Sequence, residues 1–386
     1  MRDREIIMNP LKQLIDFGQS VWLDNIHRGM LTSGELARLI EEDGVRGMTS
    51  NPTIFEKAIS SGGEYDESLR GMAGKKMTVE EIFDALSFAD IQAACDAFRP
   101  LYNKTKGEDG YVSIEVAPGF ARDTQGTILE ARRLWKSVAR PNVMVKIPAT
   151  KEGLAAIEAC LAEGININVT LIFSIERHRE VMDAYRRALE RRVREGKSAD
   201  VASVASFFVS RIDSAVDKLL QGKIQTSSSS KEKDQLLELF GKVAVANAKA
   251  AYQSFKKYFS GVWFEALKAK GARVQRPLWA STGTKNPHYP DVLYVEELIG
   301  RDTVDTVPPA TLDAFRDHGK PRASIEERLP EAMDVLEKLN LVRIDLRQVT
   351  DKLEAEGVAA FIDSYDKLMA GLTAKQEALE KQLALK

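Results

Sequence analysis

The sequence has little of what secreted and membrane proteins depend on. Cys95 and Cys160 are the only cysteines among 386 residues, which argues against a disulfide framework and is typical of a reducing compartment. The stretch after Met1 is charged and lacks the apolar segment of a signal peptide. No run approaches the roughly 18 apolar residues of a membrane span. We therefore expect a cytoplasmic location and no membrane partner.

The sequence also has almost no net charge and few aromatic residues or histidines. Lys and Arg number 55 against 57 Asp and Glu, and aromatic residues make up 7%. Binding to nucleic acid would need a basic surface and stacking side chains, so nucleic acid is not an expected partner. The four histidines show no ligand spacing, so we expect no metal site. They are His27, His178, His288 and His318.

Short β-branched runs do recur, and longer stretches with helical spacing separate them. The runs predict strands over residues 21–24, 47–51, 111–116, 142–148, 166–173, 201–209, 277–281 and 302–307. Helical patterns lie over residues 34–42, 79–98, 125–138, 152–163, 175–195 and 236–268. Eight strands separated by helices predict an α/β protein with a (β/α)8 TIM barrel. A doubly wound open sheet would alternate in a similar way and stays the alternative.

We expect a single barrel domain over residues 1–386 with two insertions. The first, near residues 60–78, is rich in glycine and charge and predicts a long loop. The second, near residues 222–234, contains four consecutive serines and predicts a mobile surface excursion. A helical extension over residues 322–386 has long helices at 325–339 and 346–385, which should pack across one end of the barrel. The sequence does not indicate the oligomeric state, and a homo-oligomer is compatible with it.

A lysine in the middle of an apolar strand is the main candidate for chemistry. Strand residues alternate between faces, so Lys146 should point into the barrel while its apolar neighbours face the helices. A buried ammonium is costly to desolvate, which makes this position unusual. The same alternation brings polar side chains inward near the carboxyl ends of the strands, where barrel enzymes build their sites. The residues that share inward faces are Trp22 with Asp24, Thr49 with Asn51, Ser113 with Glu115, Asn168 with Thr170, and Ser206 with Phe208.

A buried lysine beside carboxylates suits Schiff-base chemistry. A neutral amine adds to a ketone and loses water, and the iminium then withdraws electrons from the neighbouring C–C bond. Asp24 and Glu115 could supply the proton acceptor and the acid/base that this sequence of steps needs. The structural alternatives are a buried ion pair between Lys146 and Glu115 and a capping role for Asp24.

Cations near the carboxyl ends of two later strands are candidates for phosphate recognition. Arg211 follows the sixth strand, and Lys285 follows Ser281 and a short Gly/Thr turn after the seventh. A small turn with a lysine after a barrel strand can cradle an anion. For Lys285, simple solvent exposure is the alternative interpretation.

Taken together, these segments resemble transaldolases, in their order along the chain and from about Leu11 to Gly319. The segments that carry the resemblance are Val21-Trp22-Leu23-Asp24, Thr49-Ser50-Asn51-Pro52-Thr53, Ser113-Ile114-Glu115-Val116, Val145-Lys146-Ile147-Pro148-Ala149-Thr150, residues 164–174, and Ser206-Phe207-Phe208-Val209-Ser210-Arg211. The chain is most similar to the bacterial and plastid branch with an extended C-terminal part. The resemblance implies a barrel without cofactor that acts on small sugar phosphates in the non-oxidative pentose phosphate pathway. A dihydroxyacetone unit would pass from sedoheptulose 7-phosphate to glyceraldehyde 3-phosphate, giving erythrose 4-phosphate and fructose 6-phosphate.

The resemblance also implies a role for each matching residue. These roles are the Schiff base for Lys146, acid/base catalysis through water for Glu115, proton acceptance for Asp24, positioning of the catalytic water for Thr170, binding of the dihydroxyacetone hydroxyls for Asn51 and Asn168, lining of the substrate site for Ser206 and Phe208, and phosphate binding for Arg211. Where family members carry a second arginine after the seventh strand, this chain offers Ser281 to Lys285.

Two rival functions stay open at this point. In a fructose-6-phosphate aldolase the iminium releases free dihydroxyacetone, and that related group carries glutamine at position 115 and tyrosine at position 208. Glu115 and Phe208 therefore favour transfer over release. A catalytically silent barrel kept as a binding protein would be marked by loss of Lys146 or Asp24, and both are present.

Overall fold

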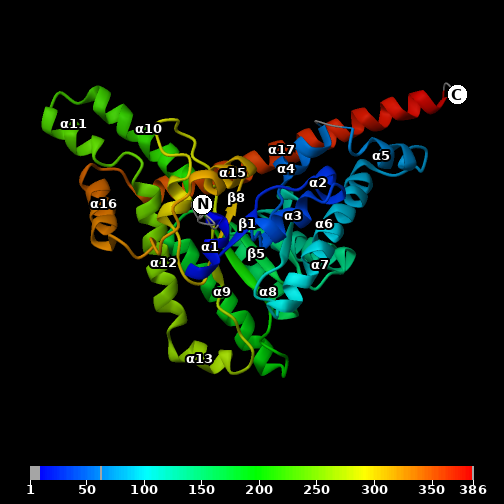
Figure 1. Ribbon diagram of the computed structural model, residues 1–386, viewed down its shortest axis with the longest axis horizontal. Coiled ribbons are helices and arrows are strands. Elements are labelled where there is room, and N and C mark those ends of the chain that lie inside the picture. The colour runs from blue at the N-terminus through cyan, green and yellow to red at the C-terminus, as the bar shows by residue number, and fades with distance from the viewer. Residues whose placement is uncertain (1–8, 61–62, 385–386) are drawn as a thin grey trace, which may run out of the picture.

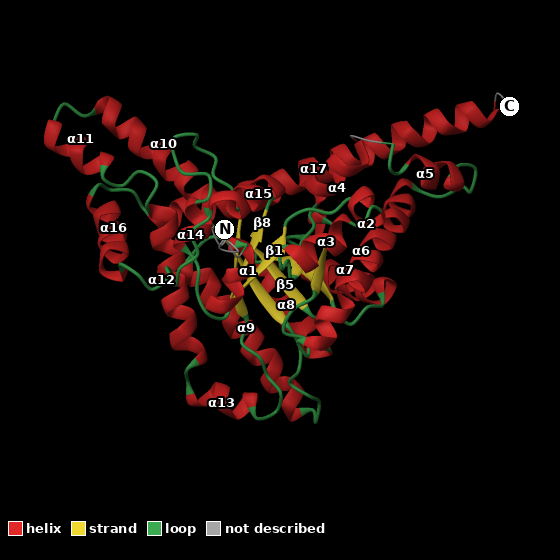
Figure 2. Ribbon diagram, viewed as in Figure 1, coloured by secondary structure: helices red, strands yellow, loops and turns green. Residues whose placement is uncertain are grey.

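Eight parallel strands form a closed barrel at the centre of the molecule, in yellow in Figure 2. The structure is a computed structural model that describes residues 9–60 and 63–384. The strands pair in chain order, which confirms all eight predicted strands and excludes the open sheet. They are β1 Gln19–Leu23, β2 Gly47–Met48, β3 Tyr111–Glu115, β4 Val143–Pro148, β5 Ile167–Ile172, β6 Ser203–Phe208, β7 Arg276–Ala280 and β8 Thr303–Val307.

Helices surround the barrel and connect its strands. Several have an N-cap side chain that accepts a hydrogen bond from a backbone N–H of the first turn. These N-cap residues are Thr78, Asp123, Thr150 and Ser174. The connecting helices are α3 Glu35–Glu42, α6 Val79–Lys104, α7 Thr124–Val138, α8 Lys151–Glu163, α9 Ile175–Arg194, α12 Val243–Phe259 and α15 Pro309–His318. Shorter or peripheral helices are α1 Pro10–Gln13, η1 Leu14–Phe17, α2 Arg28–Thr32, α4 Pro52–Ser60, α5 Asp66–Met72, η2 Pro118–Phe120, α10 Ser210–Thr226, α11 Ser230–Leu237, α13 Val262–Lys268, α14 Leu293–Glu297, α16 Leu329–Leu341 and α17 Leu346–Ala384.

Three segments differ in secondary structure from what their sequence patterns indicated. The stretch 60–78 is not a plain loop, since α5 lies within it, and residues 61–62 of it lie outside the described residues. Most of the expected excursion at 222–234 is helical, because α10 continues to Thr226 and Ser229 caps α11. The helical pattern over residues 236–268 breaks into separate helices. One break contains Gly241, whose φ of 65° suits glycine and whose Cα faces the ring of Tyr289.

Strand β5 carries one extra residue near its carboxyl end. Val169 pairs with Ala205 and Ile172 with Phe207 on β6, so three steps on one strand match two on the other. Leu171 takes up the difference with a φ of 60°, a backbone conformation that costs energy for a leucine. The alternation that predicted inward faces for Asn168 and Thr170 holds up to this bulge and ends there.

The long helix α17 lies across the carboxyl end of the barrel, in red in Figure 1, as predicted. The same prediction was wrong for the other long helix of the C-terminal extension, because α16 packs against α12. Helix α17 packs against α4, α6, α10 and β5. Polar contacts join it to α4 and α9. The hydroxyls of Thr53 and Ser364 lie 2.8 Å apart, and Arg177 Nε lies 3.3 Å from Glu354 Oε2. No helix within residues 9–60 and 63–384 is long and apolar enough to cross a membrane.

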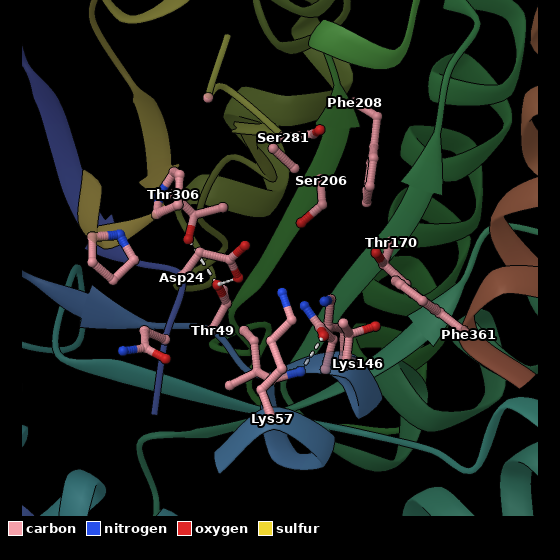
Figure 3. Close-up of a pocket in the computed structure, with 18 of the residues that line it drawn as sticks. Asp24, Thr49, Lys57, Lys146, Thr170, Ser206, Phe208, Ser281, Thr306 and Phe361 are labelled. Atoms are coloured by element: carbon pink, nitrogen blue, oxygen red, sulfur yellow. Dashed lines mark hydrogen bonds between the residues drawn. The ribbon is translucent and has the colours of Figure 1, made fainter. Parts of the chain in front are cut away.

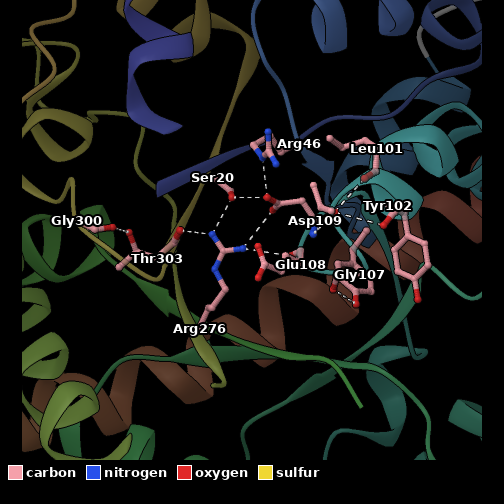
Figure 4. A network of polar contacts seen from close by, with 12 residues as sticks. Ser20, Arg46, Leu101, Tyr102, Gly107, Glu108, Asp109, Arg276, Gly300 and Thr303 are labelled. Carbon is pink, nitrogen blue, oxygen red and sulfur yellow. Dashed lines mark hydrogen bonds and ion pairs between the residues drawn. The ribbon is translucent and has the colours of Figure 1, made fainter. Parts of the chain in front are cut away.

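A network of ion pairs and hydrogen bonds closes the amino end of the barrel (Figure 4). Arg276 on β7 donates through Nη2 to Ser20 Oγ on β1, at 2.7 Å, and to the carbonyl of Thr303 on β8, at 2.6 Å. Asp109 lies between two guanidinium groups, 3.2 Å from Arg276 Nη1 and 2.6 Å from Arg46 Nε. The network thereby links β1, β7 and β8 with the segments that lead into β2 and β3, at the end opposite α17. Its ion pairs are largely buried, which strengthens them.

Candidate active site

A cavity of about 650 Å³ opens at the carboxyl ends of the strands (Figure 3). Its size suits a small-molecule substrate. Four cationic side chains line it against two carboxylates, which favours an anionic ligand. The cations are Lys57, Lys146, Arg211 and Lys285, and the carboxylates are Asp24 and Glu64. Nine of the eleven predicted site residues line this cavity, namely Asp24, Asn51, Lys146, Thr170, Ser206, Phe208, Arg211, Ser281 and Lys285.

Lys146 lies in the middle of β4 and points into the cavity, as its alternation predicted. Only 5% of the residue is exposed. Its Nζ donates to the carbonyl oxygen of Ser50 at 3.2 Å and lies 3.3 Å from Glu115 Oε2 on the neighbouring strand. The pairing of Glu115 with Lys146 across β3 and β4 sets this distance. An amine and a carboxyl group are therefore held in contact inside the barrel.

Glu115 does not line the cavity itself, and it sits behind the lysine. Burial raises the pKa of Glu115 to about 7, although the ammonium of Lys146 acts in the opposite direction. A carboxyl group with a pKa near neutrality can both give and take a proton at physiological pH. The arrangement thus suits an acid/base that works next to the amine.

Asp24 directly follows β1, and its carboxylate points into the same cavity as Lys146 (Figure 3). Its Oδ1 accepts a hydrogen bond of 2.7 Å from the hydroxyl of Thr49, and Thr306 Oγ1 lies 2.7 Å from the same hydroxyl. Since Thr49 has one hydroxyl proton, Thr306 must donate to it. Burial raises the pKa of Asp24, while the charge of Lys146 counteracts the shift. The threonine pair fixes the carboxylate and leaves its other oxygen for chemistry.

Asn168 is the second predicted residue that does not line the cavity. It is fully buried on β5, one layer below Thr170. Its Nδ2 donates to Ser113 Oγ at 3.0 Å, and its Oδ1 accepts from Ser206 Oγ at 2.7 Å. Both ends of the amide are engaged, so in this structure Asn168 supports the cavity floor, and Ser206 reaches the cavity.

Cations gather where β6 and β7 end. The guanidinium carbon of Arg211, at the start of α10, lies 5.3 Å from the centre of the Phe208 ring. Burial lowers the pKa of Arg211, since the charged form is partly desolvated. Ser281 has a φ of 56°, and its hydroxyl lies 2.9 Å from that of Ser210. This turn brings Ser281 and Lys285 to the same side of the cavity as Arg211.

Comparison with known proteins decides the family. Residues 21–372 match the family described as Transaldolase/Fructose-6-phosphate aldolase. The chain belongs to this family.

Relatives in the family share the sequence over almost the whole chain. A protein named Transaldolase 2 from Nostoc is 47% identical over 380 residues, covering 96% of this chain and 99% of that protein. Transaldolases from Trichodesmium erythraeum and Thermobifida fusca are 46% and 49% identical, covering 97% and 94% of this chain and 99% and 96% of the respective proteins. The family match extends well into α17, so this helix belongs to the part of the chain that the family shares.

Several residues line the cavity of this family member without having been predicted. Lys57 points in from α4 (Figure 3), one helical turn after Thr53, which also lines the cavity. That spacing after the Asn51-Pro52 helix start was a usable signal, since residues four apart share a helix face. Phe361 comes from α17 and Thr306 from β8. For Phe361 no local signal exists, because only the tertiary packing of α17 brings it to the site.

Proposed function

We propose that this chain is a transaldolase that works through a Schiff base on Lys146. It transfers a dihydroxyacetone unit from sedoheptulose 7-phosphate to glyceraldehyde 3-phosphate, giving erythrose 4-phosphate and fructose 6-phosphate. The observation that carries the proposal is the buried amine of Lys146, 3.3 Å from Glu115 and in one cavity with Asp24. Relatives named Transaldolase over almost the entire chain support it.

The first half of the reaction needs proton transfers at the ketone carbon and at C4. The neutral amine of Lys146 attacks the ketone carbon of the donor, and a proton passes from the nitrogen to the former carbonyl oxygen. The hydroxyl that results leaves as water after Glu115 protonates it, and an iminium remains. Asp24 then takes the proton from the hydroxyl on C4. The C3–C4 bond breaks, its electron pair moves into the iminium to form an enamine, and erythrose 4-phosphate leaves.

The second half reverses these steps with another aldehyde. The enamine carbon attacks the aldehyde carbon of glyceraldehyde 3-phosphate, and Asp24 returns its proton to the new oxygen. Water adds to the iminium that results, with Glu115 as the base, and fructose 6-phosphate is released from the restored amine. Thr170 lines the cavity beside Lys146 and suits the positioning of this water.

Phosphate binding in this proposal falls to the cations where β6 and β7 end. Arg211 can make two parallel hydrogen bonds to a phosphate, and Lys285 adds a second charge from the turn after β7. Lys285 with Ser281 thereby stands where other family members use an arginine. Lys57 lies away from both on α4 and gives the cavity a further cation.

Fructose-6-phosphate aldolase activity is the second candidate, since the family description includes it. Both activities share the iminium, and they differ in whether the enamine meets an aldehyde or a proton. Glu115 and Phe208, in place of the glutamine and tyrosine of the aldolase group, favour transfer. An assay for free dihydroxyacetone without acceptor separates the two, because a transaldolase should release it far more slowly than it forms erythrose 4-phosphate with acceptor.

Borohydride trapping tests the mechanism. With fructose 6-phosphate and borohydride, the native protein should gain one reduced three-carbon adduct on the peptide that contains Lys146, and a coupled assay should detect erythrose 4-phosphate formation from sedoheptulose 7-phosphate. Lys146→Ala should lose both signals. Lys57→Ala is the matched control, because it removes another cavity lysine and should keep the label on Lys146. Erythrose 4-phosphate formation by Lys146→Ala, or a native protein that neither reacts nor labels, would refute the proposal.

A further inference from the structure

An aromatic ring from α17 forms one wall of the cavity next to the reactive amine. Phe361 is 4% exposed and lines the cavity, and the centre of its ring lies 5.8 Å from Lys146 Nζ. Figure 3 shows the ring entering from the side of α17, beyond Thr170. Phe208 is the other phenyl ring in the cavity lining, and Arg211 lies over its face. Of the two phenyl rings, Phe361 is therefore the one in contact with the amine of Lys146.

The packing of α17 fixes the ring in place. Gly357, one turn before Phe361, lies so close to β5 that an added Cβ would stand 2.9 Å from Leu171 Cδ2. One turn after it, the hydroxyl of Ser364 meets that of Thr53 on α4. These residues form one stripe along the helix, since their spacing is four and three. Phe361 is clamped between two contacts, with little freedom to swing away from Lys146.

The three neighbours of the amine respond differently when it becomes an imine. An ammonium has three N–H donors, and here it donates to the carbonyl oxygen of Ser50 and lies 3.3 Å from the carboxylate of Glu115 as an ion pair. A protonated imine retains a single N–H, so it must give up part of this hydrogen bonding while it keeps the positive charge. The face of an aromatic ring attracts a cation through its quadrupole and needs no donor. Attraction to the ring is thus the contact that persists through the covalent intermediate.

We propose that Phe361 is a further active-site residue, whose ring stabilises the iminium on Lys146 electrostatically. The inference rests on the proposed Schiff base and adds a specific role for α17 in it. The ring also covers one side of the iminium with apolar surface, which strengthens the interaction because it is desolvated. Loss of the ring electrons should lower iminium formation roughly 5- to 10-fold, because only the difference counts between a weak contact with the solvated ammonium and a stronger contact with the iminium, from which the bound sugar displaces water.

The experiment separates the electrons of the ring from its shape. In the full chain, Phe361 is replaced by Leu, by Tyr and, biosynthetically, by pentafluorophenylalanine, whose ring face repels cations. The fraction of enzyme trapped by borohydride is measured over a series of fructose 6-phosphate concentrations, together with the Tm. Ile362→Ala is the control on the same helix, since Ile362 is partly exposed at 37% and does not line the cavity.

The outcomes separate an electrostatic role from simple packing. We expect Phe361→Leu and the pentafluoro variant to trap roughly 5- to 10-fold less at low substrate, and Phe361→Tyr and Ile362→Ala to stay close to the native protein. If the pentafluoro variant traps as well as the native protein, the inference is wrong and Phe361 only fills space. The pentafluoro variant tests the inference even if Phe361→Leu does not fold, because it keeps a ring of similar size at this position. Absence of any adduct in the native protein would instead refute the Schiff base itself.

Discussion

Asp305 on β8 is a buried carboxyl group outside the cavity whose ionisation should be measurable as stability. Its Oδ1 accepts a hydrogen bond of 2.9 Å from Thr282 Oγ1, and its Oδ2 has no partner among the described residues. Burial raises the pKa of Asp305 from 3.8 to about 7. The hydrogen bond to Thr282 also anchors the turn that carries Ser281 and Lys285, so the charge of Asp305 bears on the phosphate side of the cavity.

The raised pKa fixes the sign of the pH dependence. Stability from the protonated form is fully present below 3.8, the unfolded value, and is lost as the pH rises through about 7. The difference, 7 minus 3.8, corresponds to about 4 kcal/mol in all, at about 1.36 kcal/mol per pKa unit. Between pH 5 and pH 8 the loss is about 3 kcal/mol by the same relation. A neutral side chain of the same shape should remove this loss.

Asp305→Asn is that replacement, because its carbonyl oxygen can still accept from Thr282 and its amide carries no charge. Urea unfolding of the native and variant proteins at pH 5 and pH 8 gives the free energy of unfolding at each pH. Relative to the native protein, the variant should gain about 3 kcal/mol from pH 5 to pH 8. Asp302→Asn, which changes an exposed carboxylate, should gain nothing comparable. A gain below about 0.5 kcal/mol for Asp305→Asn would refute the reasoning.

Two further predictions concern the cavity itself. Glu115→Gln should slow iminium formation by about 10²-fold or more and abolish the inflection near pH 7 that the native pH–rate profile should show. An inflection that survives the substitution would assign it to another group. Arg211→Ala should raise KM for fructose 6-phosphate by about 10- to 100-fold, the effect of one charge-assisted hydrogen bond, with little change for unphosphorylated fructose. An equal loss with both sugars would remove Arg211 from phosphate binding.

Sequence patterns predicted the barrel and the reactive centre well because both depend on local alternation. Each strand is a short run of apolar residues, and Lys146 stands out because a charged group interrupts the inward face of such a run. The same reasoning failed in two ways. The serines near position 229 look like a linker by composition, and a local signal was missed, because Ser229 caps a helix by accepting from the backbone N–H of Glu232. Asn168 shares its face with Thr170, but alternation does not say which of them lies deeper.

Residues that reach the cavity from helices were the least predictable. Phe361 follows Lys146 by 215 positions, and an apolar helical stripe says that a face is buried without saying against what. The extra residue at Leu171 was hidden too, because the apolar run of β5 continues through it. Such features result from the packing of α17 onto β5, which single-strand periodicity does not contain.

The closure of the amino end by Arg276 and Asp109 has a consequence for how such a protein can change. The ion pairs that hold the strands in register lie at the far end from every residue that would touch a sugar. Substitutions after β6 and β7 can therefore be sampled, by natural variation or in the laboratory, with the framework preserved. Libraries aimed at new acceptor aldehydes should leave Arg46, Asp109 and Arg276 untouched and concentrate on the turn from Ser281 to Lys285.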